Sequence, residues 1–244
     1  MSSPIIVFDH VRKSYPLYQH MKGGTKHLLF HLPNVWRSIK NSTYEVLKDV
    51  SFEVKTGEAL GIIGRNGAGK STILGLIAGV LKPSSGKIVV TGRISPLLEL
   101  GAGFHPELTG RENIILNGII LGLTKTEIIK KLDEIIEFSE LGEFIEQPIR
   151  VYSSGMLARL GFSVVAHLNP DILLIDEILA VGDLEFQKKC IDKMIGFKKN
   201  RVAIIFVSHS ISDIVRICDR VLWIENHTIK ILGEPPDVVK SYTS

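Results

Sequence analysis

Cysteine is scarce in this sequence of 244 residues, where Cys190 and Cys218 are the only two. They form no C-x-x-C motif and have no histidine partner at zinc-ligand spacing. A disulfide framework is therefore not expected, and a single disulfide or metal pair is the less favoured alternative. We expect both residues to be reduced thiols in the core of a cytosolic protein.

Long apolar runs and a strong net charge are also missing. No segment approaches the roughly 18 apolar residues of a membrane-spanning helix, and no signal peptide is visible after Met1. Work on a membrane would therefore require a partner protein. The net charge of +3 is too small to indicate nucleic acid as a partner. The mean hydropathy of +0.21 fits either a buried Ile- and Leu-rich sheet or a surface that docks onto a membrane protein.

What the chain does contain is a series of short apolar runs with helical patterns between them. Three of the runs are unbroken, as is typical of parallel strands covered on both faces. The predicted strands are Ile5–Phe8, Ala59–Ile63, Ile172–Ile175 and Val202–Val207, followed by a hairpin of Val221–Ile224 and Ile229–Leu232.

The clearest helical pattern covers Lys125–Phe138. Thr124 and Glu127 have the spacing of a capping box, and isoleucines and leucines recur every three to four residues along the segment. The alternation of strands and helices predicts a layered α/β fold. At this length we expect one domain, residues 1–244.

A phosphate-binding loop is the strongest motif. The residues from Gly64 to Ser71 match G-x-x-x-x-G-K-[ST], between a predicted strand and a predicted helix. Glycines let the backbone turn its N–H groups inward, and the helix presents its positive N-terminal end to the same anion. Lys70 is predicted to reach the β- and γ-phosphates, and the Ser71 hydroxyl to bind Mg²⁺. The predicted nucleotide contacts are Gly64, Asn66, Gly67, Ala68, Gly69, Lys70, Ser71 and Thr72.

Two further strands deliver polar residues at their carboxyl ends. The strand Ile172–Ile175 is followed by Asp176 and Glu177, which suit an α/β crevice site. Asp176 is predicted to hold Mg²⁺, and Glu177 to polarise the attacking water. His209 follows the strand Val202–Val207 and is predicted to contact the γ-phosphate, against the alternative of an ordinary hydrogen-bonding residue.

The segment Tyr152–Met156 resembles a degenerate form of LSGGQ, the signature motif of ABC ATPases. It retains Ser153 and Gly155 at the start of a predicted helix, where a second anion-binding end would lie. In that family this end binds the γ-phosphate held by the other subunit. The resemblance implies that Ser153, Ser154 and Gly155 contact ATP, and that the working unit is a homodimer with two nucleotides between its protomers.

Other parts of the ABC pattern follow in order, with departures. Asp183 resembles the acid of the family's D-loop and is expected near the nucleotide. Tyr15 resembles the aromatic residue that stacks on adenine, with Tyr44 as the alternative. No glutamine stands where the family has its Q-loop, so Glu99 is the nearest candidate for a Mg²⁺ contact there. Met156 replaces the signature glutamine.

Leu97–Ile114, together with the signature and D-loop segments, resembles the polysaccharide-exporting ABC ATPases, which handle lipid-linked O-antigen, capsule and teichoic acid. The resemblance implies a P-loop fold with a mainly parallel sheet, an antiparallel β subdomain and a helical subdomain at about 100–168. It also implies ATP and Mg²⁺ as ligands, two copies of a transmembrane permease as partners, and a lipid-linked glycan as cargo. The expected location is the cytoplasmic face of the bacterial inner membrane, with Leu97–Arg111 as the surface that couples to the permease. Because longer members carry a C-terminal carbohydrate-binding domain, the end at Ser244 predicts the short form of the O-antigen exporter.

One basic segment, at about 16–44, does not fit the alternation. It contains four basic residues and no acid, together with Phe30 and Trp36. It is interpreted either as a solvated loop or as a segment that meets anionic headgroups or a pyrophosphate-linked glycan. The basic residues are Lys22, Lys26, Arg37 and Lys40.

Several rival functions stay open at this stage. Another ABC cargo is possible, as is a soluble ABC ATPase, although the second cassette or long coiled coil usual in that class is missing. A small GTPase would need an NKxD motif, which the sequence lacks. A nucleotide sensor without turnover would fit the degenerate signature, but the full set of predicted catalytic groups favours an ATPase.

Overall fold

The computed structural model describes residues 3–16, 43–97, 101, 103–176 and 183–244. Its centre is a six-stranded sheet in which five strands run parallel and the last runs antiparallel. In spatial order the strands are β5 (Ile94–Leu97), β6 (Ile172–Asp176), β7 (Ala203–Val207), β3 (Ala59–Ile63), β8 (Arg220–Glu225) and β9 (Thr228–Gly233). The predicted strands of this sheet, with the β8–β9 hairpin, are therefore confirmed; the remaining predicted strand, Ile5–Phe8, lies within β1 (Pro4–Pro16) of a second sheet.

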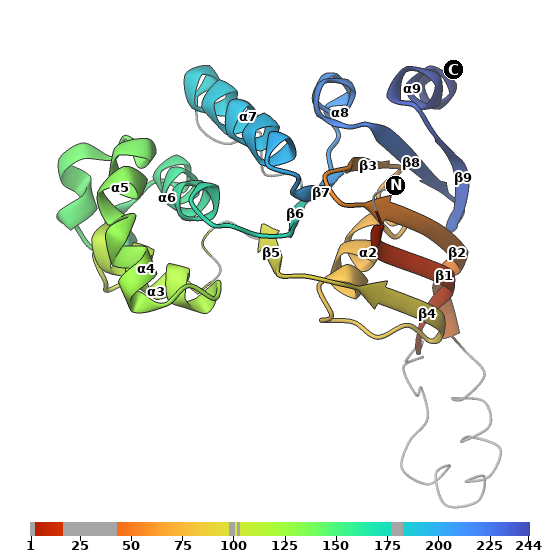
Figure 1. The fold of residues 1–244 in the computed structure, drawn as a ribbon, viewed down its shortest axis with the longest axis horizontal. Helices are drawn as coiled ribbons and strands as arrows, with labels where there is room; N and C mark the ends of the chain where they lie inside the picture. Colours follow the sequence, from red (N-terminus) through yellow and green to blue (C-terminus); the bar gives the residue numbers. More distant parts are fainter. Residues whose placement is uncertain (1–2, 17–42, 98–100, 102, 177–182) are drawn as a thin grey trace, which may run out of the picture.

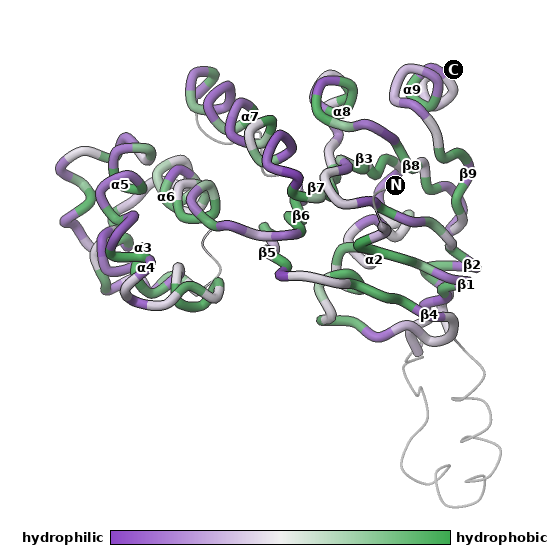
Figure 2. The backbone as a smooth tube through the Cα atoms, in the orientation of Figure 1, coloured by the Kyte–Doolittle hydropathy of each residue, from purple (hydrophilic) through white to green (hydrophobic). Residues whose placement is uncertain are grey.

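Both faces of this sheet are covered, which explains the unbroken apolar runs. In β3, Leu60 and Ile62 face a core shared with a second sheet, whereas Ala59 and Ile63 face the opposite core. The second sheet is antiparallel, in the order β2 (Thr43–Lys55), β1 (Pro4–Pro16), β4 (Ser85–Val90). In Figure 2 the green, apolar stretches run along the strands of both sheets.

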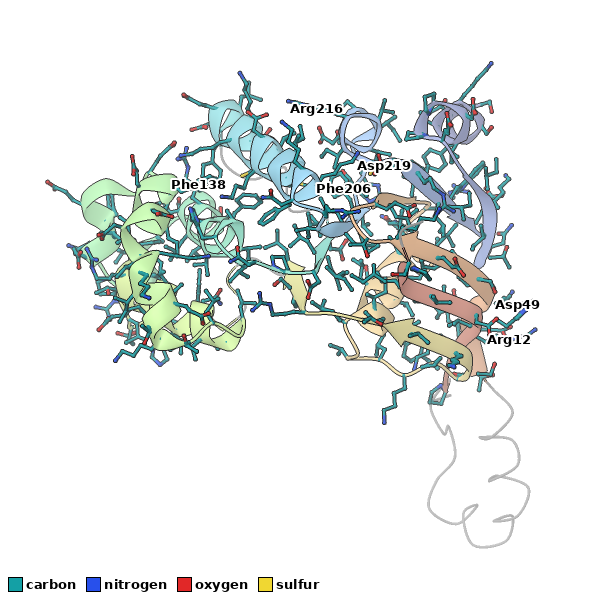
Figure 3. The ribbon with its side chains drawn as sticks, viewed as in Figure 1. Arg12, Asp49, Phe138, Phe206, Arg216 and Asp219 are labelled. Atoms are coloured by element: carbon teal, nitrogen blue, oxygen red, sulfur yellow. The ribbon has the colours of Figure 1, made fainter. Side chains whose placement is uncertain are left out.

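Helices cover the two faces unequally. Helix α2 (Lys70–Ile77) packs into the core between the sheets. Helices α7 (Leu184–Lys199), α8 (Ile211–Ile217) and α9 (Pro235–Thr243) lie across the other face, above the sheet in Figure 1. Phe206 of β7, labelled in Figure 3, is fully buried beneath them. This arrangement is the mainly parallel α/β fold with an antiparallel β layer that the sequence predicts.

A group of helices projects to one side of the sheets, at the left of Figure 1. Each of its first two helices begins with a capping box, at Thr109–Glu112 and at Thr124–Glu127. The helices are α3 (Gly110–Ile120), α4 (Lys125–Lys130), α5 (Leu132–Ser139), two 3₁₀ turns at Gly142–Glu146 and Ile149–Val151, and α6 (Ser154–Ala166).

The single helix predicted over Lys125–Phe138 is wrong, because α4 and α5 are separate and meet at Lys131. Ile128 and Ile135 are buried on either side of the break, so the apolar stripe continues through it and hides it. The Lys131 ammonium donates a 2.6 Å hydrogen bond to the carbonyl of His167, just beyond α6. That contact joins residues far apart in sequence and is not contained in the local pattern.

The two cysteines are buried free thiols, as expected. Burial raises the pKa of Cys190 and of Cys218 to about 12. Within the described part of the chain, no helix combines the length and apolar character needed to cross a membrane.

Candidate nucleotide-binding site

The loop between β3 and α2 adopts a backbone path that side chains would obstruct. Gly64 has φ 152°, and a Cβ on it would lie 2.4 Å from the carbonyl oxygen of Ile224. Gly69 has φ 110°, and its Cβ would lie 2.9 Å from the carbonyl oxygen of Val46. Glycine alone fits both the dihedral angle and the space at these positions. The loop is thereby curled at the amino end of α2, which is the geometry of an anion-binding site.

Lys70 reaches back across this loop. Its side chain is mostly buried, and its ammonium donates to the carbonyl oxygens of Gly64 at 2.9 Å and Arg65 at 3.2 Å. A lysine held at the mouth of an amide-lined loop adds a fixed positive charge to the helix end. The arrangement suits a multiply charged phosphate chain.

The carboxyl end of strand β6 contacts the phosphate-binding loop and helix α2 directly. The Ser71 hydroxyl donates a 3.2 Å hydrogen bond to the Asp176 carboxylate. Asp176 ends β6 and is in register with Val207 of the neighbouring strand β7. The two predicted Mg²⁺ ligands, which are 105 positions apart in the sequence, therefore lie side by side.

A pocket of about 580 Å³ opens beside these groups. Tyr44, the alternative candidate for the stacking aromatic, forms part of its wall. Tyr15 pairs with Tyr44 across β1 and β2 but does not line this pocket, and the Lys13 ammonium lies 4.8 Å from the centre of its ring. The lining residues are Tyr44, Val46, Asn66, Gly67, Gly69, Lys70, Ser71, Thr72 and Asp176.

Tyr44 reaches the pocket because β2 is the strand beside the C-terminal hairpin. The backbone N–H of Lys48 on β2 donates to the carbonyl of His227 in that hairpin at 2.8 Å. Strand β1 lies on the far side of β2, one strand further from the hairpin. The sheet order thus distinguishes the two tyrosines, which the sequence left as alternatives.

The other predicted residues of this centre are only partly described. His209 is exposed, two residues beyond the end of β7, and follows the buried Ser208. Glu177 and Glu99 lie outside the described residues, as does the stretch 180–182 of the predicted D-loop. Strand β5 ends at Leu97, which pairs with Ile175, so the carboxyl end of β5 lies next to the carboxyl end of β6.

The predicted signature forms a separate helix end. Ser153 caps α6, with its hydroxyl accepting a 3.2 Å hydrogen bond from the N–H of Met156. Ser153 and Ser154 are exposed, and neither lines the pocket beside Lys70. Figure 1 places α6 in the helical group, apart from α2. The structure therefore does not bring the two anion-binding ends together within one chain.

Arg159 connects the signature helix to its surroundings, and the sequence analysis missed it. Its guanidinium bonds Glu140 at 2.8 Å and Asp183 at 2.6 Å, and lies 4.7 Å from the centre of the Phe186 ring. It is the only charged residue of α6, which is otherwise mostly apolar. A single charge in such a helix is the sequence feature from which an ion pair could have been predicted. Phe138, labelled in Figure 3, packs edge-on against Phe186 at the same junction.

Hydrogen bonding keeps the acids of this junction ionised. The bond from Lys189, and then the bond from Arg159, hold the pKa of Glu140 below its usual value. For Asp183 the largest cause of a lowered pKa is the backbone N–H of Phe186, which its side chain caps at 2.9 Å. Asp183 therefore both starts α7 and ties that helix to α6 through Arg159.

The glycine loop after β3, the lysine that spans it and the aspartate at the end of β6 define the nucleotide-binding domain of a P-loop NTPase. The family model described as "ABC transporter" matches residues 47–180, more than half of the chain. The chain belongs to the ABC transporter family.

Comparison with known proteins places relatives inside that family. The chain is 57% identical over 239 residues to an O-antigen export system ATP-binding protein, RfbB, of Klebsiella pneumoniae, covering 98% of this chain and 97% of that protein. It is 44% identical to a teichoic acids export ATP-binding protein, TagH, of Listeria innocua, over 97% of this chain and 69% of that one. A dimeric ATP-binding cassette solved in a post-hydrolysis state, bound to ADP and phosphate, has the same fold, with a TM-score of 0.73 at 21% identity, over 94% of this chain and 98% of that one.

The Arg159 junction predicts a stability difference between two arginines. Arg159→Ala should lower the free energy of unfolding by about 2 kcal/mol. The substitution removes an arginine side chain that is only 17% exposed, together with its charged hydrogen bonds to two carboxylates. Urea denaturation followed by circular dichroism measures the change.

Arg150→Ala is the matched control. Arg150 also binds a glutamate at 2.7 Å, but both partners are about 60% exposed, so its loss should cost less than about 0.5 kcal/mol. Equal losses for the two variants would contradict the structural role of Arg159.

Proposed function

We propose that this chain is the ATP-binding and ATP-hydrolysing subunit of an ABC transporter that exports a lipid-linked polysaccharide, the O-antigen of lipopolysaccharide, across the inner membrane. The observation that carries the proposal is the 57% identity to an O-antigen export protein over nearly the whole of both chains. The subunit would work at the cytoplasmic face of the membrane, held there by two copies of a permease.

The geometry of the phosphate-binding loop supports ATP binding. ATP would enter with its phosphates at the amino end of α2, against Lys70 and the loop amides. The signature end at Ser153 and Ser154 is exposed and lies outside that pocket. A second copy of the chain can supply it from the opposite side, with Gly155 leaving room for close approach. Two nucleotides would then lie between two protomers, and preferential binding to this closed state would drive closure.

The oxygens of Ser71 and Asp176 fit Mg²⁺. They are 3.2 Å apart, close to the roughly 3.0 Å between adjacent ligands of an octahedral ion whose bonds are about 2.1 Å. Bound there, the ion would neutralise negative charge on the phosphates. Glu99 remains a candidate for a further contact.

Hydrolysis is assigned to residues around the strand ends. Glu177 would orient and polarise the attacking water, and His209 would contact the γ-phosphate and sense its loss. Lys70 would stabilise the charge that develops on the phosphoryl oxygens. Asp183, the D-loop acid, is fixed by Arg159 and by the N–H of Phe186 and would lie near the partner's nucleotide.

The role of Glu177 predicts a trapped state. Glu177→Gln should lower ATP turnover by about 100-fold or more while leaving ATP binding intact. Size-exclusion chromatography with ATP and Mg²⁺ should then show a stable dimer. Glu185→Gln, an exposed acid in the first turn of α7, is the matched control and should stay monomeric with normal turnover. Rapid hydrolysis by the Glu177 variant would contradict the assignment.

Export is tested in the host. The gene is deleted, and the strain is complemented with wild type, Lys70→Ala or Lys125→Ala; the last variant alters an exposed lysine of α4. We expect lipid-linked glycan to accumulate inside the cell, and surface polysaccharide to return with wild type and Lys125→Ala only. Fractionation followed by glycan blotting measures both pools. Unchanged surface polysaccharide in a deletion strain without a redundant exporter would contradict the cargo.

Teichoic acid or capsule export is the second candidate, favoured by the 44% identity to the teichoic acid export protein. The glycan that accumulates in the same deletion strain identifies the cargo. A nucleotide sensor without turnover is distinguished from both by measuring ATP hydrolysis.

The basic segment is proposed to contact anionic headgroups or the pyrophosphate-linked glycan; residues 17–42 lie outside the described part. Changing Lys22, Lys26, Arg37 and Lys40 together to Gln should impair transport more than basal ATPase activity, because only transport needs the anionic surface. The control removes the same number of charges from exposed described positions, Lys87, Lys125, Lys188 and Lys240. Unchanged transport in the first variant would refute the idea.

A further inference from the structure

The turn of the β8–β9 hairpin has an unusual residue at its second position. Asn226 and His227 connect Glu225 to Thr228 with φ of 51° and 69°. A two-residue turn with both central φ angles positive is the type in which Asn-Gly is preferred, because glycine takes the second angle without strain. Any side chain at that position holds the backbone in the left-handed region at an energetic cost that glycine avoids. The His227 side chain is therefore the feature to explain.

That side chain meets the wall of the nucleotide pocket. The Nε2 atom of His227 lies 3.3 Å from the Tyr44 hydroxyl, and the two rings stand at 84° with centroids 5.5 Å apart. The His227 carbonyl also accepts the Lys48 N–H, which ties the turn to β2. Its Nδ1 atom is buried without a hydrogen-bond partner among the described residues. Tyr44 is thus the polar contact that the imidazole makes there.

The hairpin also borders a recess that adjoins the phosphate loop. A second pocket, of about 510 Å³, is lined by the turn and by loop residues Arg65 to Ala68. It shares Tyr44, Asn66 and Gly67 with the pocket beside Lys70. The hollow therefore continues from the phosphate-binding loop past Tyr44 to the hairpin, where a group attached to bound phosphates would extend.

We propose that His227 is a positioning residue for the nucleotide, which orients the Tyr44 ring for stacking on the purine base. Tyr44 is 48% exposed, so its ring would otherwise be ordered only when the base binds. A hydrogen bond to its free end and an edge-on ring contact fix it in advance, which lowers the entropic cost of binding. The inference rests on the proposed binding of ATP.

The test distinguishes recognition of the base from binding of the phosphates. His227→Gly relieves the turn but removes the imidazole, so the KM for ATP should rise about three- to tenfold while kcat at saturation changes less than about twofold. Affinity for Mg²⁺-tripolyphosphate, which has no base, should not change. Tyr44→Phe, which keeps the ring and loses the hydroxyl, should raise KM similarly. The double variant should be no worse than the more impaired of the two single variants, because both remove one interaction.

Two controls guard against a merely structural role. Thr228→Ala alters the first residue of β9, which lines neither pocket, and should leave KM unchanged, whereas His227→Gln, which can still hydrogen-bond the Tyr44 hydroxyl, should recover part of the affinity. An unchanged KM in His227→Gly would overturn the proposal, as would an equal loss of ATP and tripolyphosphate binding. A wild-type protein that binds no ATP would instead refute the proposed function, so the two failures are distinguishable.

Discussion

Lys70 closes the β3–α2 loop on itself by bonding the carbonyls of Gly64 and Arg65, and the rest of the site is arranged around that closure. The loop can curl only because Gly64 packs against Ile224 and Gly69 against Val46, where no Cβ would fit. Those two contacts come from β8 and β2, so the phosphate loop is held between the two sheets. Its shape therefore depends on the packing of the whole core.

The same packing supplies the second wall of the pocket. Because β2 lies against the hairpin, Tyr44 and His227 are brought together from positions 183 residues apart. The second position of the hairpin turn, where glycine would cost less conformational energy, is a histidine. Its imidazole contacts the tyrosine ring that borders the phosphate-binding loop. The left-handed backbone at His227 and its contact with Tyr44 therefore occur at the same residue.

A different kind of link joins the helical group to the sheets. Arg159 bonds Glu140 at the end of α5 and Asp183 at the start of α7, with Phe186 under its guanidinium. The signature end of α6 is about one and a half turns away from this arginine. Movement of α6 would therefore be passed to the start of α7, and thus to the acid assigned to the partner's nucleotide.

The strands β3, β6, β7 and β8, the hairpin, the phosphate loop and the ABC family could be predicted from the sequence, because they depend on unbroken apolar runs and on motifs within a few residues of one another. The parallel strand β5, which is short and contains a proline, was not predicted. The sequence also predicted Mg²⁺ contacts from Ser71 and Asp176, two residues whose side chains the structure places 3.2 Å apart. It did not reveal the break at Lys131, the choice of Tyr44 over Tyr15 as the pocket residue, or the roles of Arg159 and His227. These features became visible in the folded chain, because each depends on a contact between residues far apart in the sequence.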